Sequence, residues 1–254
     1  MRILRSSAVF FVLICMGFAA ETQEICEGFG PQSPRDISTK AGQNTKAFAL
    51  APSAASLNLC NIHTHTQAEH RGPGFAYASG AGGFRCNGSD ALTAAERAPL
   101  KGAYKGAAPG DTVEVHWVYS SCDVMPGEGL AACAPQTCAE PQIRVEAQVF
   151  LLVNDPEALD FGDYAYAANR VGRPQPKALP DGGVPVIYAG STTGPAYSAS
   201  ICSPLHVTWS VRPDCVKLDI ASLHRWAEAN VFNETKSHGV RALVTAPALL
   251  SPIE

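Results

Sequence analysis

Nine cysteines spread along the 254-residue chain constrain its fold more than any other feature of the sequence. No two of them have the Cys-x-x-Cys spacing that is typical of zinc and redox motifs. Cys15 lies in an apolar N-terminal stretch that we expect to be removed, which leaves an even number. An even number in an exported chain favours disulfides over a thiolate metal site. The remaining cysteines are Cys26, Cys60, Cys86, Cys122, Cys133, Cys138, Cys202 and Cys215.

The first twenty residues have the organisation of a secretory signal peptide. Two arginines precede an apolar run at 8–18, and two alanines end it. The run is too short for a comfortable membrane span, which takes about 20 apolar residues. We therefore expect residues 1–20 to be cleaved near Ala20, and residues 21–254 to form a secreted or periplasmic single domain with no stable membrane span.

Charge and composition exclude two classes of protein. The chain has 19 Lys and Arg against 23 Asp and Glu, a formal net charge of −4 at pH 7. It lacks the basic patch that neutralises phosphates, so we expect no nucleic-acid partner. With 46% hydrophobic and 17% charged residues, it is a globular chain rather than a disordered one.

Short stretches rich in β-branched and aromatic residues, bounded by Gly or Pro, predict strands along most of the chain. Residues 149–153 are continuously apolar and should be buried on both faces of a sheet. One helix is expected after Asp219, which can cap it, with apolar residues on one side up to Val231. The pattern predicts a β-dominated α+β domain with a central, twisted, mostly antiparallel sheet, whose long connections are functional or held by disulfides. The expected strands are at about 57–67, 112–120, 142–153, 184–190, 205–211 and 240–245.

Two of these strands place histidines where they could share one metal ion. Side chains two residues apart on a strand point to the same face, so His63 and His65 lie together. His116 lies on the second strand, between Glu114 and Val118 on one face. We expect these two strands to be central and adjacent in the sheet. If they are close, three imidazoles can bind zinc and leave a fourth position open, as in catalytic zinc sites. A set of polar strand residues facing water is the alternative.

A histidine that binds a metal needs an acceptor for its other ring N–H. Asn61 and Glu114 stand two positions before His63 and His116, on the same faces, and are the candidates for that role. Taken alone, Glu114 is better explained as a solvated strand carboxylate.

The other histidines receive no metal role. His70 falls on the opposite face of the first strand and is expected to be structural. Nothing places His238 near the metal, and His206 and His224 have the pattern of structural or surface residues. No residue is assigned as a proton shuttle.

The histidine stretches resemble the delta-class carbonic anhydrases, whose hallmark we identify at 60–72, Cys-Asn-Ile-His-Thr-His-Thr-Gln-Ala-Glu-His-Arg-Gly. The resemblance continues at 113–122, 145–150, 188–195 and 202–204, and so extends over most of the mature chain. It implies an enzyme that hydrates carbon dioxide reversibly to bicarbonate and a proton. The cofactor would be Zn²⁺, with Co²⁺ or Cd²⁺ as alternative ions, and zinc-bound hydroxide would be the nucleophile.

A looser resemblance is to the alpha-class carbonic anhydrases, which also have His-x-His on one strand and a third histidine on another. It implies a similar fold. The alpha-class threonine that accepts a hydrogen bond from the zinc hydroxide and donates one to a glutamate implies catalytic roles for Thr192 and Glu69. Glu69 is much closer to His65 in sequence than its alpha-class counterpart. Val118 and Trp209 are the candidates for the apolar wall of the substrate pocket, with core packing as their alternative.

Two other functions remain open from the sequence. The spacing His63-x-His65-x-x-x-Glu69 also occurs in the first motif of cupin metalloenzymes, where Glu69 would be a fourth ligand. Against this, Ser120 stands where the second cupin motif usually has Asn, and the Thr192 segment has no role there. A non-catalytic exported metal-binding protein is the remaining interpretation.

Overall fold

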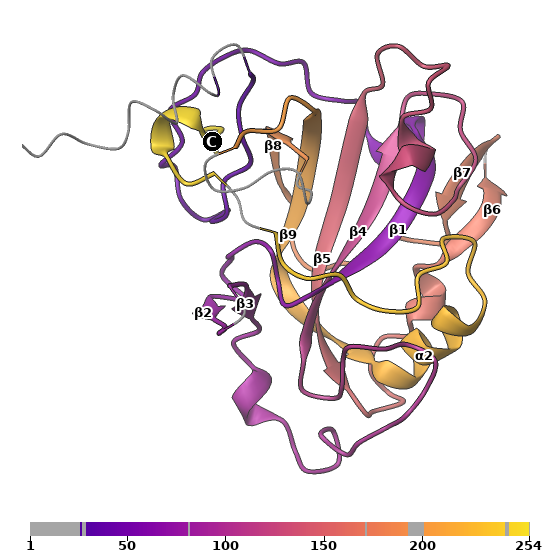
Figure 1. Ribbon diagram of the computed structural model, residues 1–254. Helices are drawn as coiled ribbons and strands as arrows, with labels where there is room; N and C mark the ends of the chain where they lie inside the picture. The colour runs from indigo at the N-terminus through magenta and orange to yellow at the C-terminus, as the bar shows by residue number, and fades with distance from the viewer. Residues whose placement is uncertain are drawn as a thin grey trace, which may run out of the picture.

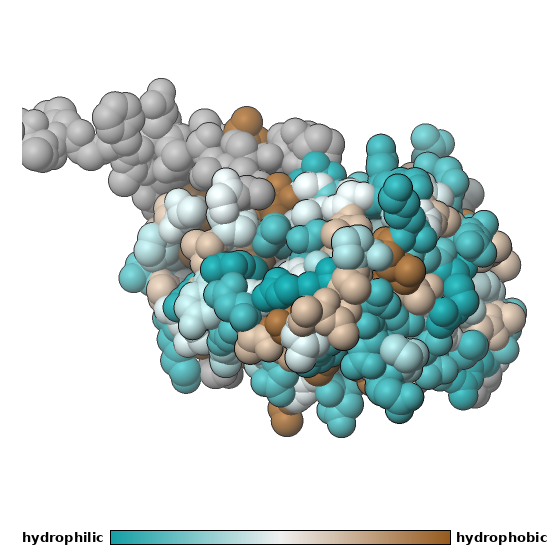
Figure 2. Space-filling view, turned by 90° about the horizontal axis from the view of Figure 1, so that it is seen from below, coloured by the Kyte–Doolittle hydropathy of each residue, from teal (hydrophilic) through white to brown (hydrophobic). Residues whose placement is uncertain are grey.

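The computed structural model describes residues 26, 29–80, 82–170, 172–192, 201–241 and 244–253. The expected signal peptide at 1–20 lies outside the described residues. Among the helices that are described, none is long and apolar enough to cross a membrane. Hydrophilic side chains cover most of the face shown in Figure 2, and hydrophobic ones occur there as separate spots.

A five-stranded sheet forms the centre of the structure, in the strand order β1-β4-β5-β9-β8 (Figure 1). Neighbouring strands pair antiparallel except β5 and β9, which run parallel. The expected β-dominated domain with a mostly antiparallel sheet is therefore confirmed. The strands are β1 (Asn58–Thr66), β4 (Thr112–Ser120), β5 (Ile143–Val153), β8 (Val186–Ser191) and β9 (His206–Asp219).

Smaller elements complete the described structure, and the sequence pattern did not predict the short strands because each has only two to five residues. Two hairpins are formed by β2 (Tyr77–Ala78) with β3 (Phe84–Arg85), and by β6 (Tyr166–Arg170) with β7 (Arg173–Pro176). The 3₁₀ turns are η1 (Ala54–Ser56), η2 (Ser89–Ala91), η3 (Leu130–Cys133), η4 (Phe161–Asp163) and η5 (Pro247–Leu249).

Helix α2 (Ile220–Glu228) begins directly after β9. Asp219 caps it as the sequence predicted, because its carboxylate accepts two backbone N–H groups of the first turn at 3.1 and 3.2 Å. The expected extension to Val231 is wrong. The side chain of Asn230 accepts the backbone N–H groups of Phe232 and Glu234, which turns the chain, and Val231 is 55% exposed beyond the helix.

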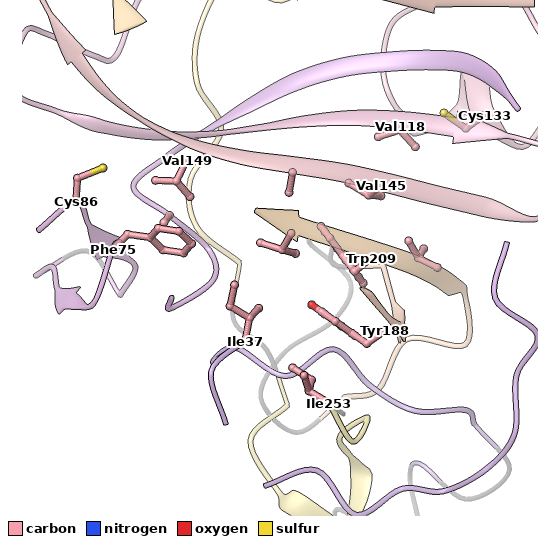
Figure 3. Close-up of a cluster of buried hydrophobic side chains, with 14 of the residues drawn as sticks. Ile37, Phe75, Cys86, Val118, Cys133, Val145, Val149, Tyr188, Trp209 and Ile253 are labelled. Atoms are coloured by element: carbon pink, nitrogen blue, oxygen red, sulfur yellow. The ribbon is translucent and has the colours of Figure 1, made fainter. Parts of the chain in front are cut away.

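The two faces of the sheet bury different side chains. On one face, which we call the helix face, α2 packs with Trp117 and Phe150. The opposite face, the site face, buries Val118, Val145 and Trp209 together with residues from outside the sheet (Figure 3). The N-terminal and C-terminal segments lie side by side next to this face, joined by backbone hydrogen bonds (Figure 1).

Two of the expected strands differ from the structure, one in its length and one in its existence. β9 continues to Asp219 instead of ending near 211, because Pro213 falls at an irregularity in the pairing with β5, where a missing N–H is tolerated. The strand expected at 240–245 is wrong for the described residues of that range, none of which is in a strand. There the backbone of Arg241 bonds to the side chains of Glu69 and Arg35 instead of to another strand.

The position of β1 also differs from the expectation that both histidine strands are central. β1 and β4 are adjacent, but β1 is the first strand of the sheet. Its outer edge is partly paired with the backbone of His238, which exchanges hydrogen bonds with Thr64 and Thr66 at 2.8 and 2.7 Å. The edge of the sheet is therefore covered where it carries the histidines.

All eight cysteines of the expected mature chain form disulfides, as the sequence predicted. The pairs are Cys26–Cys202, Cys60–Cys133, Cys86–Cys215 and Cys122–Cys138. They attach the long connections to the sheet, for example 72–111 to β9 and 121–141 to β1. Four disulfides are typical of a protein in an oxidising compartment, and no thiolate is left among these cysteines for a metal.

Disulfides that close long loops should contribute more to stability than one that closes a short loop. Cys86–Cys215 spans 129 residues and Cys122–Cys138 spans 16. We expect the double variant Cys86→Ala/Cys215→Ala to lose about 1.5–2 kcal/mol more free energy of unfolding than Cys122→Ala/Cys138→Ala. Urea unfolding followed by tryptophan fluorescence measures both. Equal losses would show that loop closure does not set the contribution of these bonds.

Candidate metal centre

Three histidines from two adjacent strands meet on the site face. His63 of β1 is paired directly with His116 of β4, and His65 follows two residues later on the same face of β1. Each of the three offers a ring nitrogen, and these nitrogens all lie within 4.8 Å of one another. The prediction that the two strands bring the histidines together is therefore confirmed.

Each of the three histidines has an oxygen acceptor at its other ring nitrogen. The pairs are His63 Nδ1 with Asn61 Oδ1 at 2.7 Å, His65 Nδ1 with the Gly239 carbonyl at 3.1 Å, and His116 Nε2 with Glu114 Oε1 at 2.9 Å. The amide of Asn61 is oriented because its Nδ2 donates to the Gly127 carbonyl at 2.9 Å. All three acceptors are oxygens without a proton, so each imidazole carries its proton on the outer nitrogen.

The inner nitrogens consequently turn three lone pairs toward one point. His63 Nε2 and His116 Nδ1 are 3.2 Å apart, and neither has a proton to share. Burial lowers the pKa of His63 well below its usual value and also lowers the pKa of His65; His116 lowers both further, while Glu69 partly opposes the shift in His65. Neutral imidazoles with converging lone pairs repel one another unless a cation lies between them. This donor set fits a zinc ion, which accepts three imidazole nitrogens.

Glu114 is a buried carboxylate that joins His116 to His70 and to the backbone that follows β1. Besides His116, its oxygens accept from His70 Nδ1 at 2.7 Å and from the backbone N–H groups of Glu69 at 2.6 Å and His70 at 3.1 Å. Burial alone would raise the pKa of Glu114, but His70 and His116 outweigh it and hold this pKa well below its usual value. Glu114 is therefore an anion with four N–H donors.

The strand pattern predicted that His70 lies on the face opposite to His63 and His65, and this prediction is wrong. β1 ends at Thr66, and Gln67 has φ of 66°, so the alternation of faces stops there. The chain instead turns His70 under the site, where Nδ1 faces Glu114 and Nε2 lies 3.0 Å from the Tyr188 hydroxyl. His70 therefore has a structural role, because its ring links the side chains of Glu114 and Tyr188.

No hydrogen bond joins Thr192 and Glu69 in the described residues. Glu69 Oε1 lies 3.3 Å from His65 Nδ1 and accepts the Arg241 N–H at 2.8 Å, while Oε2 is buried without a partner. The Thr192 hydroxyl instead bonds to the Ser203 hydroxyl at 2.9 Å. Glu69 thus sits at the outer nitrogen of His65, whereas the cupin alternative needs it beside the inner nitrogens.

A cavity of about 520 Å³ opens onto the three histidines. Val118 and Trp209 line it, together with Ile143, Val145 and Val207, so its inner wall is apolar. Thr192 also lines it. Most of the polar lining, which we call the polar wall, comes from one segment near the C-terminus, with Asn233, Glu234, Lys236, His238 and Arg241.

His238 is the part of the site that the sequence did not predict. Its ring centre lies 5.9 Å from that of His63 and 5.8 Å from that of His65. Its Nε2 is 3.1 Å from Glu234 Oε2, and this hydrogen bond raises the pKa of His238. The segment reaches the site by pairing its backbone with the edge of β1, and no strand pattern in the sequence signals that pairing.

Comparison with curated proteins gives no match. Among solved structures, an alpha-carbonic anhydrase from Thermovibrio ammonificans in complex with the inhibitor sulfanilamide is 16% identical, with coverage of 88% of this chain and 91% of that chain and a TM-score of 0.28. The Photobacterium profundum alpha-carbonic anhydrase is 15% identical, with coverage of 89% and 94% and a TM-score of 0.29. TM-scores this low do not establish a common fold.

The family assignment depends on the sequence match alone. The model of the delta carbonic anhydrase family matches residues 54–222, which include β1, β4, β5 and the three histidines. This match extends over more than half of the chain, and the protein therefore belongs to the delta carbonic anhydrase family.

Proposed function

We propose that this carbonic anhydrase hydrates carbon dioxide reversibly with a zinc ion held by His63, His65 and His116. The observation that carries the proposal is the convergence of three unprotonated ring nitrogens, each fixed by an acceptor on its outer side. A zinc ion in such a site lowers the pKa of a water ligand to about 7 and so supplies a hydroxide nucleophile at neutral pH. Family membership favours this function over the cupin and non-catalytic interpretations.

Asn61, Glu114 and the Gly239 carbonyl hold the three imidazoles in the tautomer that binds a metal. Of these, Glu114 carries a full negative charge, so it also makes His116 a more basic ligand. Because the carboxylate is buried and has four N–H donors, it can rotate only by giving up several hydrogen bonds at once. We therefore assign Glu114 the largest share in orienting the ligands.

The apolar wall is the proposed binding surface for carbon dioxide, which has no charge and no net dipole. Val118 and Trp209 are buried, at 1% and 3% exposure, and face the cavity beside the histidines. The Trp209 ring centre is 5.1 Å from that of His116, so a small apolar molecule on this wall lies close to the metal-facing nitrogens. The polar wall then leads bicarbonate and protons toward solvent.

We assign Thr192 to orienting the nucleophile and Glu69 to accepting the threonine proton. Thr192 lines the cavity, and Glu69 Oε2 is a buried acceptor without a partner. A hydroxyl can accept a hydrogen bond in a fixed direction when its own proton is committed to another acceptor. In the described structure Ser203 is the partner of Thr192, so this assignment requires the Thr192 side chain to turn from Ser203 toward Glu69.

The zinc proposal is tested by removing one ligand at a time. We expect the purified wild-type protein to contain one zinc per chain, and His63→Ala, His65→Ala and His116→Ala each to lose it. Metal content by mass spectrometry and carbon dioxide hydration are measured on the same samples. His206→Ala is the matched control, because His206 does not line this cavity. A ligand variant that keeps full zinc and full activity would show that the ligand set is wrong.

The acceptors behind the histidines should affect metal affinity without being ligands. We expect Glu114→Ala to lower zinc affinity by roughly 10–100-fold, and Asn61→Ala to lower it less, because a neutral amide is the weaker acceptor. Competition with a chelator measures the affinity, and circular dichroism checks the fold. Glu114→Gln retains the shape and removes the charge. Wild-type affinity in both Glu114 variants would leave the carboxylate with a packing role only.

The role of Thr192 is separable from metal binding. Thr192→Val keeps the shape of the side chain and removes the hydroxyl, so zinc content should not change. We expect kcat/KM for carbon dioxide hydration to fall by on the order of 10–100-fold or more. Glu69→Gln should give a similar loss, and the double variant should be little worse than either. Full activity in Thr192→Val excludes the orienting role, and zinc loss in Glu69→Gln would make Glu69 a ligand.

A further inference from the structure

A cluster of charged side chains lies on the helix face, directly behind the apolar wall of the cavity. Val145 of β5 lines the cavity, so its neighbours Arg144 and Glu146 point to the opposite face. On β9, Ser210 and Arg212 are on that same face and bond to the Glu146 carboxylate. The mechanism proposed above uses none of these residues.

The cluster has more positive than negative charge. Arg144 Nε donates to Glu146 Oε1 at 2.6 Å, and Arg212 Nη1 donates to Glu146 Oε2 at 3.1 Å. One carboxylate therefore lies between two guanidinium groups, with side-chain exposures of 10% for Arg144, 8% for Arg212 and 5% for Glu146. Burying an uncompensated charge is costly, so the excess positive charge disfavours the cluster unless an anion or water compensates it.

Most of the donors of the two guanidinium groups are free. An arginine has five N–H donors, and Arg144 and Arg212 have no other hydrogen-bond partner among the residues that the structure describes. Their remaining nitrogens are not fully buried, since none of them is among the buried atoms that lack a partner. The free N–H groups therefore keep some contact with solvent.

A third donor lies beside the two arginines. Tyr119 of β4 is paired directly with Arg144 of β5, and neighbouring side chains on paired strands lie close together. The Tyr119 side chain is fully buried, and its hydroxyl has no hydrogen-bond partner. Burial raises the pKa of this hydroxyl, and the charges that act on it are those of Glu146, Arg212 and Arg144. The hydroxyl therefore keeps its proton and is available as a donor.

We propose that Arg144, Arg212 and Tyr119 form a binding site for a small planar oxyanion of charge −1, the class that includes bicarbonate and simple carboxylates. A guanidinium group offers paired N–H groups that match two oxygens of such an anion. One negative charge balances the cluster, and the tyrosine hydroxyl gains an acceptor. The site is separate from the metal centre, so it does not depend on the proposed function.

Side-chain NMR of the full-length mature protein tests the site directly. The Arg Nε–H signals of Arg144 and Arg212 are assigned by their loss in Arg144→Gln and Arg212→Gln. We expect both signals to shift and saturate on titration with sodium acetate or sodium bicarbonate at constant ionic strength. Acetate is not a product of the reaction, so a shift with acetate shows that the site recognises this class of anion and not bicarbonate alone. No shift with either salt overturns the proposal.

Thermal unfolding in the same salts provides the matched control. Tyr119→Phe keeps every charge and almost the whole volume, so it should fold even if Arg212→Gln does not. Without the anion it should be as stable as wild type or more stable, because it removes a buried hydroxyl with no partner. With the anion, wild type should gain more stability, and the apparent anion affinity of Tyr119→Phe should be roughly tenfold weaker.

Comparing the variants with wild type removes the effect of anions that bind at the metal centre. The metal centre is unchanged in Tyr119→Phe and Arg212→Gln, so only the difference from wild type reports on the helix face. The same difference should persist when each variant is combined with His65→Ala. Identical anion responses in wild type, Tyr119→Phe and Arg212→Gln overturn the proposal, as does chloride binding as tightly as acetate. Neither result bears on carbon dioxide hydration.

Discussion

The buried carboxylate of Glu114 is the interaction on which the rest of the site depends. It belongs to β4, yet it holds the backbone at Glu69 and His70, a segment that has already left β1. It also fixes His116 on its own strand. A carboxylate at this depth is tolerated only because four N–H groups satisfy it. The same charge therefore stabilises the turn after β1 and sets the tautomer of a proposed metal ligand.

The sequence predicted the core of the site because that part depends on strand periodicity. His63, His65 and His116 lie on regular stretches of β1 and β4, where alternation alone decides which side chains share a face. The same rule placed Asn61 and Glu114 beside them.

The sequence could not predict what enters the site from outside the strands. Alternation ends at Gln67, whose backbone has a positive φ, so His70 was assigned to the wrong face. His238 reaches β1 through backbone hydrogen bonds, and the Gly239 carbonyl accepts from the His65 ring. Both contacts use the backbone of the C-terminal segment, which leaves no pattern in its side chains. The parallel pairing of β5 with β9 likewise depends on contacts between residues that are distant in the sequence. The same is true of the disulfides, because an even number of cysteines does not determine which of them pair.

The Thr192 side of the cavity depends on such a distant contact. Gln32, in the N-terminal segment that has no strand pattern, accepts the Ser203 N–H at 2.9 Å and the Ser191 hydroxyl at 3.1 Å, and it donates to the Ser203 carbonyl at 3.0 Å. The Cys26–Cys202 disulfide joins the same two segments. One amide and one covalent bond thus fix both Ser191, which precedes Thr192, and Ser203, which bonds to it. The histidine side of the cavity is held by the charge of Glu114 on a central strand, and the threonine side by the N-terminal segment that contains Cys26 and Gln32. Because these two supports share no residue, a change in one can alter the position of Thr192 while the three histidines stay in place.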